Sequence, residues 1–489
     1  MDDNAWVDDA TAPVQERDRT TRLGGQFWIW AGANIAPINW VLGALGISMG
    51  LSLRDTLLVL ILGNGIGMTV FGFFTVLGQR TGVSAMVMGR GVFGRRGNYV
   101  PTAVQLLVVV GWCAVNTWIV LDLVMALLGK LGAVDPSAPN YGAKILVASI
   151  IMTIQVVVSF FGYRVIATFE RWTVPPTLLI LLAMSIAAWG FLGVDWSYAG
   201  PATGALSGSA RIVAMSQVMT AIGIGWGLTW LTYAGDYSRF VSTSVPRARL
   251  WLVSAAGQII PVIWLGVLGA TLATKSATVD PGQLIVENFG SLAIPVLLLV
   301  VHGPIATNIL NVYSFSVTAQ ALDVRIPRRV LSVIVGVLAM IAVVAFIYSS
   351  GIAETLDAWL SGVVGWTATW GGVVFVHHYV LDRERRDFSP LCDGPTTRRV
   401  DAVNWRALAA FGVGVVATWL FMYGMVPALQ GPIASAMGGL DLSWLAGMIV
   451  SSGSYYLLMR GRPLPLDAAG RIEPTAVART AAAPANAAL

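Results

Sequence analysis

The sequence contains little charge. Asp, Glu, Lys and Arg make up 11% of its 489 residues, hydrophobic residues make up 56%, and the mean hydropathy is +0.73. Soluble domains carry about 25% charged residues. The composition therefore excludes a soluble globular fold and predicts an integral membrane protein.

Cysteine and histidine are also scarce. Cys113 lies in an apolar stretch and Cys392 in a polar loop, so the two are not expected to form a structural disulfide. The three histidines, His302, His377 and His378, do not have the spacing of a metal-ligand cluster. The few acidic residues between apolar stretches have no metal-binding spacing either. We therefore expect neither an enzyme nor a resident cofactor or metal ion.

Neither end of the chain has a long apolar run. Residues 1–24 are polar and charged, which predicts an N-terminal tail without a cleavable signal peptide. Residues 461–489 are rich in Ala and Pro, which predicts a disordered C-terminal tail. The folded domain is expected over residues 25–460.

Long apolar stretches are abundant. A helix needs about 20 mainly apolar residues to cross about 30 Å of hydrocarbon. Twelve stretches meet this requirement, at residues 27–50, 54–79, 100–129, 143–162, 173–193, 212–235, 250–273, 291–321, 330–349, 355–380, 406–426 and 441–459. The sequence thus predicts an all-α polytopic protein with about twelve transmembrane helices.

Basic residues are distributed asymmetrically between the connecting segments. If both tails are cytoplasmic, only five of the 30 Lys and Arg residues fall outside: Arg54, Lys130, Lys144, Arg211 and Lys275. Cytoplasmic loops are enriched in basic residues, so this arrangement predicts both termini in the cytoplasm of a cell-membrane protein. Because topology explains the net charge of +5, there is no case for nucleic-acid binding.

Two spans have the composition of interrupted helices. The first contains Pro37 between Asn34 and Asn39, and the sixth contains glycines at alternate positions around Trp226. Interrupted helices at matching positions in two halves point to a binding site near the membrane midplane, because unwound backbone exposes polar groups there. We therefore expect spans one to five (about 25–195) and six to ten (about 210–380) to be inverted repeats, followed by two extra helices (about 405–460).

Several motifs together resemble one family. They are "WAGAN", "LGALG" and "SLRDTLLVLILGN" in the first two spans, "GWCAVN" in the third, "WLTYAGDYSRF" in the sixth and "TNILNVYSFSVTAQAL" in the eighth. In this order they resemble the purine–cytosine permease branch of the nucleobase:cation symporter-1 family. The resemblance implies a LeuT-like fold and a secondary active transporter that imports a nucleobase by cation symport with alternating access.

The resemblance also implies a substrate site. Trp112 and Trp230 match the two aromatic residues that hold the base, while Asn116 and Asn311 match polar residues that contact it. The chemistry is suitable, since aromatic rings stack on a planar base and amides offer both a donor and an acceptor to its edge. Four further candidate contacts are Gly32, Asn34, Trp226 and Asn308.

The hydroxyl groups of the eighth span bear on which coupling ion the protein uses. Thr307 is present, but Ala306 stands where sodium-coupled relatives carry a second hydroxyl, which weakens a sodium site near Asn34 and Thr307. Asp122 and His302 are ionisable groups within spans and could carry a proton. The sequence therefore favours proton over sodium coupling.

Asp236 and Arg239, at the cytoplasmic end of the sixth span, are expected to form an ion pair or gate element.

Alternatives for the substrate are a related heterocycle, such as a pyridoxine-like vitamin, a thiamine-precursor pyrimidine, allantoin or a hydantoin, or an amino acid carried by the same fold. An amino acid would require a seat for its carboxylate and would have less use for two stacking tryptophans. A channel is disfavoured because the polar residues cluster at one depth.

Overall fold

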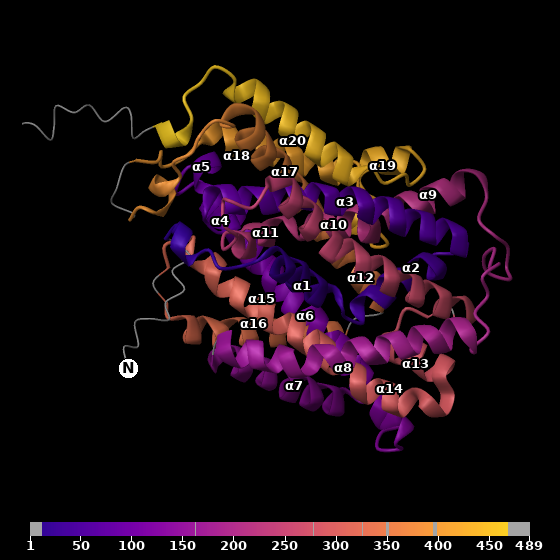
Figure 1. Ribbon diagram of the computed structural model, residues 1–489. Helices are drawn as coiled ribbons and strands as arrows, with labels where there is room; N and C mark the ends of the chain where they lie inside the picture. The colour runs from indigo at the N-terminus through magenta and orange to yellow at the C-terminus, as the bar shows by residue number, and fades with distance from the viewer. Residues whose placement is uncertain are drawn as a thin grey trace, which may run out of the picture.

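The structure is a computed structural model that describes residues 12–161, 163–276, 278–324, 326–348, 352–394 and 399–467. Over these residues the only β pairings are two isolated bridges, Thr21 with Val241 and Tyr423 with Gln430. The long helices lie side by side in one bundle (Figure 1). The predicted all-α architecture is therefore confirmed. Parts of both predicted tails, residues 1–11 and 468–489, lie outside the described residues.

The α-helices follow one another with few long connections. They are α1 (Leu23–Asn34), α2 (Ile38–Ser48), α3 (Leu53–Thr81), α4 (Ala85–Met88), α5 (Arg90–Phe93), α6 (Tyr99–Lys130), α7 (Tyr141–Phe161), α8 (Tyr163–Gly190), α9 (Gly208–Val218), α10 (Ile224–Thr229), α11 (Leu231–Ser238), α12 (Arg247–Ser276), α13 (Pro281–Phe289), α14 (Ala293–Val300), α15 (His302–Gln320), α16 (Arg328–Ile347), α17 (Ile352–Val376), α18 (Trp405–Leu420), α19 (Pro432–Ala436) and α20 (Ser443–Met459). π-Helical turns cover Met219–Gly223 and His377–Leu381, and 3₁₀ turns cover Glu16–Asp18, Gly290–Leu292, Ser389–Cys392, Pro427–Leu429 and Pro465–Asp467.

Each predicted span coincides with one helix or with consecutive helices. The first corresponds to α1 and α2, the sixth runs from α9 to α11, and the eighth comprises α14 and α15. Among the described residues, eight helical segments are long and apolar enough to cross a membrane by themselves. The first span is missing from these eight because it is interrupted, the fifth because only Pro175–Gly190 of it has described side chains, and the last two because α18 and α20 have only 16 and 17 residues.

The packing between spans is preserved when each span of the first half is exchanged with its counterpart five numbers later in the second half. In the first half, α2 of span one packs on α12 of span seven; in the second half, α10 and α11 of span six pack on α3 of span two. The third and eighth spans, α6 and α15, contact each other directly. In addition, α16 packs on α6 just as α7 packs on α15. This reciprocity is what two structurally equivalent five-helix repeats require.

Glycines bring the backbones of the broken spans against their neighbours. A Cβ atom at Gly43 of α2 would lie 1.9 Å from the carbonyl oxygen of Gly266 in α12. In the other repeat, a Cβ atom at Gly227 of α10 would lie 2.3 Å from the backbone of Gly67 in α3. No larger residue fits at these positions, so the glycines of span six serve close helix packing as well as the interruption.

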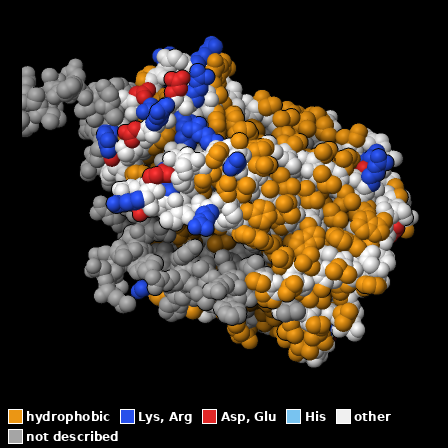
Figure 2. Space-filling model, in the orientation of Figure 1, with side chains coloured by type: hydrophobic (Ala, Val, Ile, Leu, Met, Phe, Trp, Pro, Cys, Tyr) orange, Lys and Arg blue, Asp and Glu red, His pale blue; other side chains and the backbone are white. Residues whose placement is uncertain are grey.

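The surface separates an apolar belt from a charged end. Large hydrophobic side chains are exposed along the outer helices, including Leu107, Leu146, Leu179 and Ile341 at 60% or more. Figure 2 shows apolar atoms across the middle of the molecule and most charged atoms at the end where the described part of the chain begins and ends in Figure 1. Such a belt is the surface that a bilayer covers, so the fold is that of a multi-pass membrane protein.

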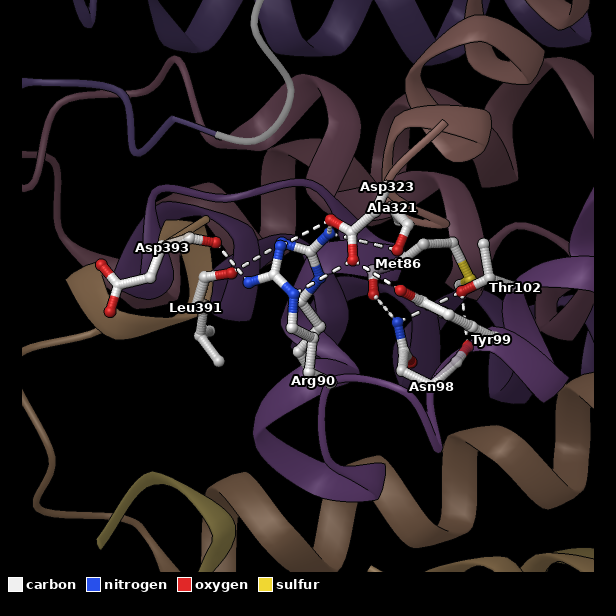
Figure 3. A network of polar contacts seen from close by, with 10 residues as sticks. Met86, Arg90, Asn98, Tyr99, Thr102, Ala321, Asp323, Leu391 and Asp393 are labelled. Atoms are coloured by element: carbon white, nitrogen blue, oxygen red, sulfur yellow. Dashed lines mark hydrogen bonds and ion pairs between the residues drawn. The ribbon is translucent and has the colours of Figure 1, made fainter. Parts of the chain in front are cut away.

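A polar network closes the end of the bundle that carries both termini, called here the terminal end. Asp323, directly after α15, accepts hydrogen bonds from Arg90 at 3.0 Å, Arg95 at 2.5 Å and Tyr99 at 2.6 Å (Figure 3). Arg90 is fully buried and also donates to the Leu391 carbonyl at 2.8 Å. The network therefore joins the α5–α6 region to the end of α15 and to the loop that follows span ten.

The Asp323 carboxylate is the anionic centre of this network. Burial alone would raise its pKa, but hydrogen bonds from Arg95 and Tyr99 and the charges of Arg90 and Arg95 hold the pKa below its usual value. A lowered carboxyl pKa stabilises the folded protein above the pKa of the unfolded chain, and this contribution is lost as the pH falls through the folded pKa.

Asp323→Asn should destabilise the protein by about 3–5 kcal/mol, because it leaves the buried Arg90 guanidinium without a counter-charge. Asn also tolerates the left-handed backbone of this position, where φ is +61°, so the substitution isolates the charge. Thermal unfolding in detergent measures the loss. Asp18→Asn is the control, since its ion pair with Arg17 is mostly exposed and is worth about 0–1 kcal/mol. Equal stability losses in the two variants would contradict the prediction.

Candidate functional site

The first interruption is closed by asparagine side chains. Helix α1 ends at Asn34, and α2 begins at Ile38, after Pro37. Asn34 Nδ2 donates to the Trp30 carbonyl at 2.9 Å, and Asn39 Nδ2 donates to the Asn34 carbonyl at 2.5 Å. The Asn34 carbonyl at the end of α1, which the break would otherwise leave unpaired, is thus satisfied by the Asn39 amide.

The sixth span is interrupted through a π-helical turn at Met219–Gly223, after which α10 begins. A Cβ atom at Gly225 would lie 1.8 Å from the carbonyl oxygen of Thr220, so only glycine fits there. The indole Nε1 of the next residue, Trp226, donates to Asn34 Oδ1 at 3.1 Å. This hydrogen bond joins the two interrupted helices to each other.

A row of tryptophan rings runs beside these interruptions. The Trp112 and Trp226 ring centroids lie 5.4 Å apart, those of Trp226 and Trp230 lie 6.5 Å apart, and those of Trp230 and Trp30 lie 6.1 Å apart. All three contacts are edge-to-face, with interplanar angles of 77–86°. Trp226 thus contacts both Trp112 and Trp230, and these two rings do not contact each other. A base between Trp112 and Trp230 would require Trp226 to move.

A small cavity opens between α1, the Trp230–Ser238 region and α15. Its lining residues are Ile29, Trp30, Ala33, Trp230, Tyr233, Tyr237, Thr307, Leu310, Asn311 and Ser314. The cavity volume is ≈ 10 Å³, which is about the space for one water molecule. Of the predicted substrate residues, Trp230 and Asn311 line it. Gly32 borders open space, because a Cβ atom there would meet nothing within 4 Å.

The other predicted contacts are bonded within the protein and do not line this cavity. Asn116 Nδ2 donates to the Trp112 carbonyl at 3.0 Å, one turn earlier in α6. Asn308 Nδ2 lies 2.8 Å from the Cys113 carbonyl oxygen, and Asn308 Oδ1 accepts from Asn311 Nδ2 at 3.2 Å. Both Asn34 amide atoms are also used, as described above. In this conformation these side chains bond other protein groups outside the cavity lining.

The candidate coupling residues lie in different places. Thr307 lines the cavity, and its hydroxyl donates to the Gly303 carbonyl at 3.3 Å. Gly303 packs against the first interruption, since a Cβ atom there would lie 3.6 Å from the Ile35 carbonyl oxygen. Asp122 lies far along α6, where its Oδ2 accepts the Gly282 N–H of α13 at 2.7 Å. The side chain of His302 lies outside the described ones.

Asp236 and Arg239 do not form the ion pair that their spacing led us to expect. Asp236 Oδ1 accepts the Ala85 N–H at the start of α4 at 3.0 Å, and the Arg239 guanidinium stacks over the Phe240 ring at 4.7 Å. Both side chains are buried. The ion pair is absent because the carboxylate is directed at the short helix α4 and the guanidinium at its own chain neighbour. At the terminal end, the Asp323 network provides the inter-helix ion pairs instead.

Three residues of this region were not predicted from the sequence: Trp30, Tyr233 and Gln155. Trp30 is the first residue of the "WAGAN" motif, one turn before Asn34, and Tyr233 follows Trp230 by three residues. Residues three or four apart share a helix face, so Trp30 could have been predicted from Asn34 and Tyr233 from Trp230. Gln155 is a single amide in an otherwise apolar span, and this isolation was its only signal.

Comparisons with known proteins agree on one family. The family model described as "Permease for cytosine/purines, uracil, thiamine, allantoin" matches residues 13–447. The purine-cytosine permease fcyB of Emericella nidulans is 26% identical over 466 residues, covering 91% of this chain and 85% of that protein. The purine-cytosine permease FCY21 of Saccharomyces cerevisiae is 24% identical over 466 residues, covering 88% and 83%.

Solved structures establish the fold. Mhp1, a nucleobase-cation-symport-1 family transporter in a closed conformation with bromovinylhydantoin bound, has a TM-score of 0.73 at 17% identity, covering 92% of this chain and 94% of that chain. A sodium-coupled sialic acid symporter has a TM-score of 0.52 at 12% identity, covering 90% and 98%. The predicted LeuT-like arrangement is confirmed by these neighbours and by the reciprocal packing of the two repeats. With a family match over most of its length, the chain belongs to the family of permeases for cytosine/purines, uracil, thiamine and allantoin, and it is a membrane transporter of the nucleobase:cation symporter-1 type.

Proposed function

We propose that this transporter imports a nucleobase, cytosine or a purine such as adenine or hypoxanthine, by cation symport with alternating access. The observation that carries the proposal is the cavity at the junction of both interrupted helices and α15. It combines aromatic faces, from Trp30 and Trp230, with the amide of Asn311. Relatives named as purine-cytosine permeases support the same substrate class.

The polar groups of the cavity suit the edge of a base. Trp230 Nε1 is buried and has no protein partner, so its N–H is available to an acceptor on a ligand. An unpaired buried donor costs about 1–3 kcal/mol, which a ring nitrogen or carbonyl oxygen of a base would recover. A planar heterocycle offers this acceptor together with two faces for the tryptophans.

An amino acid is a poorer fit. Its carboxylate would need free backbone N–H groups at an interrupted helix. Among the described residues that line the cavity, none is a Lys, Arg or His that could hold a carboxylate. The hydantoin bound to Mhp1 is a heterocycle like a nucleobase, and therefore supports the same chemistry rather than a separate function.

A base needs more room than one water molecule, so binding must involve movement of the tryptophan rings. Trp226 is tied to Asn34, whereas Trp230 Nε1 has no protein partner. We propose that Trp230 moves more readily and that its displacement opens the cavity for a base. A site with two arrangements is what alternating access requires.

We propose the proton as the coupling ion, with Asp122 as its carrier and His302 as a second candidate. Asp122 connects α6 to the N-terminus of α13 through the Gly282 N–H, so a change in its charge would alter the contact between these helices. The competing hypothesis is sodium, held by the Thr307 hydroxyl and by carbonyls of the first interruption near Asn34 and Ile35.

We also propose that the terminal end faces the cytoplasm. Basic residues gather there, including Arg19, Arg80, Arg90 and Arg95, and Figure 2 shows a group of Lys and Arg side chains at this end. The positive-inside bias supports this orientation. The Asp323 network would then close the cytoplasmic side of the bundle, together with Asp236 and Arg239 as candidate gate residues.

Trp230→Ala should weaken base binding by about 1–3 kcal/mol, because it removes an aromatic face of the cavity; Trp112→Ala should do the same if Trp226 moves aside and the base enters between Trp112 and Trp230, and Phe at either position should retain part of the affinity. Binding of adenine and cytosine to the purified protein by calorimetry measures the loss. Trp419→Ala, on the outer face of α18, is the matched control. If both alanine variants fold normally and bind as tightly as the control, the tryptophans do not hold the base.

Uptake into proteoliposomes should follow an inward proton gradient, collapse with a protonophore and be unchanged when choline replaces sodium. Asp122→Asn should abolish this dependence yet leave base binding measurable, since the amide oxygen can still accept the Gly282 N–H. Asp135→Asn, in an exposed loop, is the control. Uptake that needs sodium and survives the protonophore would instead assign coupling to the region of Thr307.

A further inference from the structure

A chain of buried polar side chains leads from the interior of the protein to the cavity wall. Its members are Thr117 of α6, Gln155 of α7, and Asn308 and Asn311 of α15. The first three are fully buried, and only Asn311 reaches the cavity. These side chains are therefore arranged behind a single ligand-facing amide.

The direction of the Asn308 amide is fixed by the backbone of α6. Asn308 Nδ2 lies 2.8 Å from the Cys113 carbonyl oxygen, and a carbonyl can only accept. Consequently, the amide must turn its NH₂ group, and not its oxygen, toward α6. The same nitrogen lies 3.0 Å from Thr117 Oγ1 and 3.0 Å from Gln155 Oε1, so its two N–H groups are shared among these three acceptors.

The side-chain oxygen of Gln155 accepts hydrogen bonds in this network. Its Oε1 is 2.9 Å from Thr117 Oγ1 as well as within reach of Asn308. Its Nε2 is buried without a partner, which is unfavourable. The orientation of Gln155 is thus dictated by the two donors at its oxygen, and the cost at its nitrogen is tolerated.

The orientation of the Asn308 amide in turn fixes the orientation of the Asn311 amide. Because Asn308 Nδ2 is directed at α6, Asn308 Oδ1 is left to accept, and it accepts from Asn311 Nδ2 at 3.2 Å. Asn311 must therefore turn its NH₂ group toward Asn308. Its carbonyl oxygen remains for the cavity, so this wall presents an acceptor.

We propose that Thr117, Gln155 and Asn308 are positioning residues that hold the Asn311 carbonyl oxygen toward the cavity, so that the transporter selects heterocycles that present an N–H group to α15. This inference rests on the proposed function and specifies its substrate: a free base with an unsubstituted ring or amino N–H at that edge. A heterocycle methylated on that nitrogen would leave the Asn311 oxygen unpaired and should bind at least about tenfold more weakly.

Competition binding to the purified full-length protein tests the proposal, with pairs of heterocycles that differ by one N-methyl group: adenine with its N-methyl derivatives, and cytosine likewise. The readout is the affinity ratio within each pair, which measures selection rather than overall binding. We expect Thr117→Val to lower this ratio about three- to tenfold, and Thr117→Ser, which keeps the hydroxyl, to preserve it. Thr367→Val is the matched control, because Thr367 is equally buried and bonds only the Val363 carbonyl of its own helix.

A second variant and a double mutant separate positioning from folding. Gln155→Met removes the acceptor and should lower the ratio in the same direction. In an Asn311→Ala background, Thr117→Val should have no further effect on the ratio, since it acts through Asn311. An unchanged ratio in well-folded Thr117→Val and Gln155→Met proteins overturns the inference, as does wild-type protein that binds bases without discriminating N-methylation. Wild-type protein that binds no heterocycle at all would overturn the proposed function and this inference together.

Discussion

A buried backbone that leaves the helix must find partners for its polar groups, and this constraint organises the centre of the protein. Hydrocarbon offers no water to an unwound segment, and each unsatisfied group costs several kcal/mol. Here the partners are supplied by side chains of the interrupted spans themselves. Asn34 and Asn39 serve carbonyls near the first break, and the Trp226 indole bonds Asn34 across from the sixth span. The two breaks therefore stabilise each other and keep the row of tryptophans in place.

The two sets of helices around the cavity are held together by different means. Spans one, two, six and seven meet through glycines at backbone-to-backbone distance, as at Gly43 with Gly266 and at Gly227 with Gly67. Spans three, four and eight are joined instead by buried side-chain amides and hydroxyls around Asn308. The cavity lies between the two sets, with Trp230 from the first and Asn311 from the second. A relative movement of the sets would change the distance between these residues while preserving the contacts within each set.

Much of this architecture could be predicted from the sequence. Apolar length located the spans, and Pro37 and the alternate glycines located both interruptions, because these signals are local. The position of Trp226 between Trp112 and Trp230 could not be predicted, since it depends on how the sixth span meets the first. The partner of Asp236 could not be predicted either, because Ala85 is 151 residues away in the sequence. Spacing within a helix indicates which side chains share a face, but the partner across from that face is set by tertiary packing.

Asn308 illustrates why a polar residue in a membrane span can be essential to a site without contacting the ligand. From the sequence it was a candidate contact, directly after Thr307 and three residues before Asn311. In the structure its amide is fully occupied by α6, α7 and Asn311. A single flexible amide on the cavity wall could present either its donor or its acceptor, and would then discriminate poorly between bases. Connection through Asn308 to a backbone carbonyl removes that freedom, because the carbonyl of Cys113 cannot become a donor. The selectivity of the cavity thus derives from the fixed polarity of an α6 peptide group that the ligand never contacts.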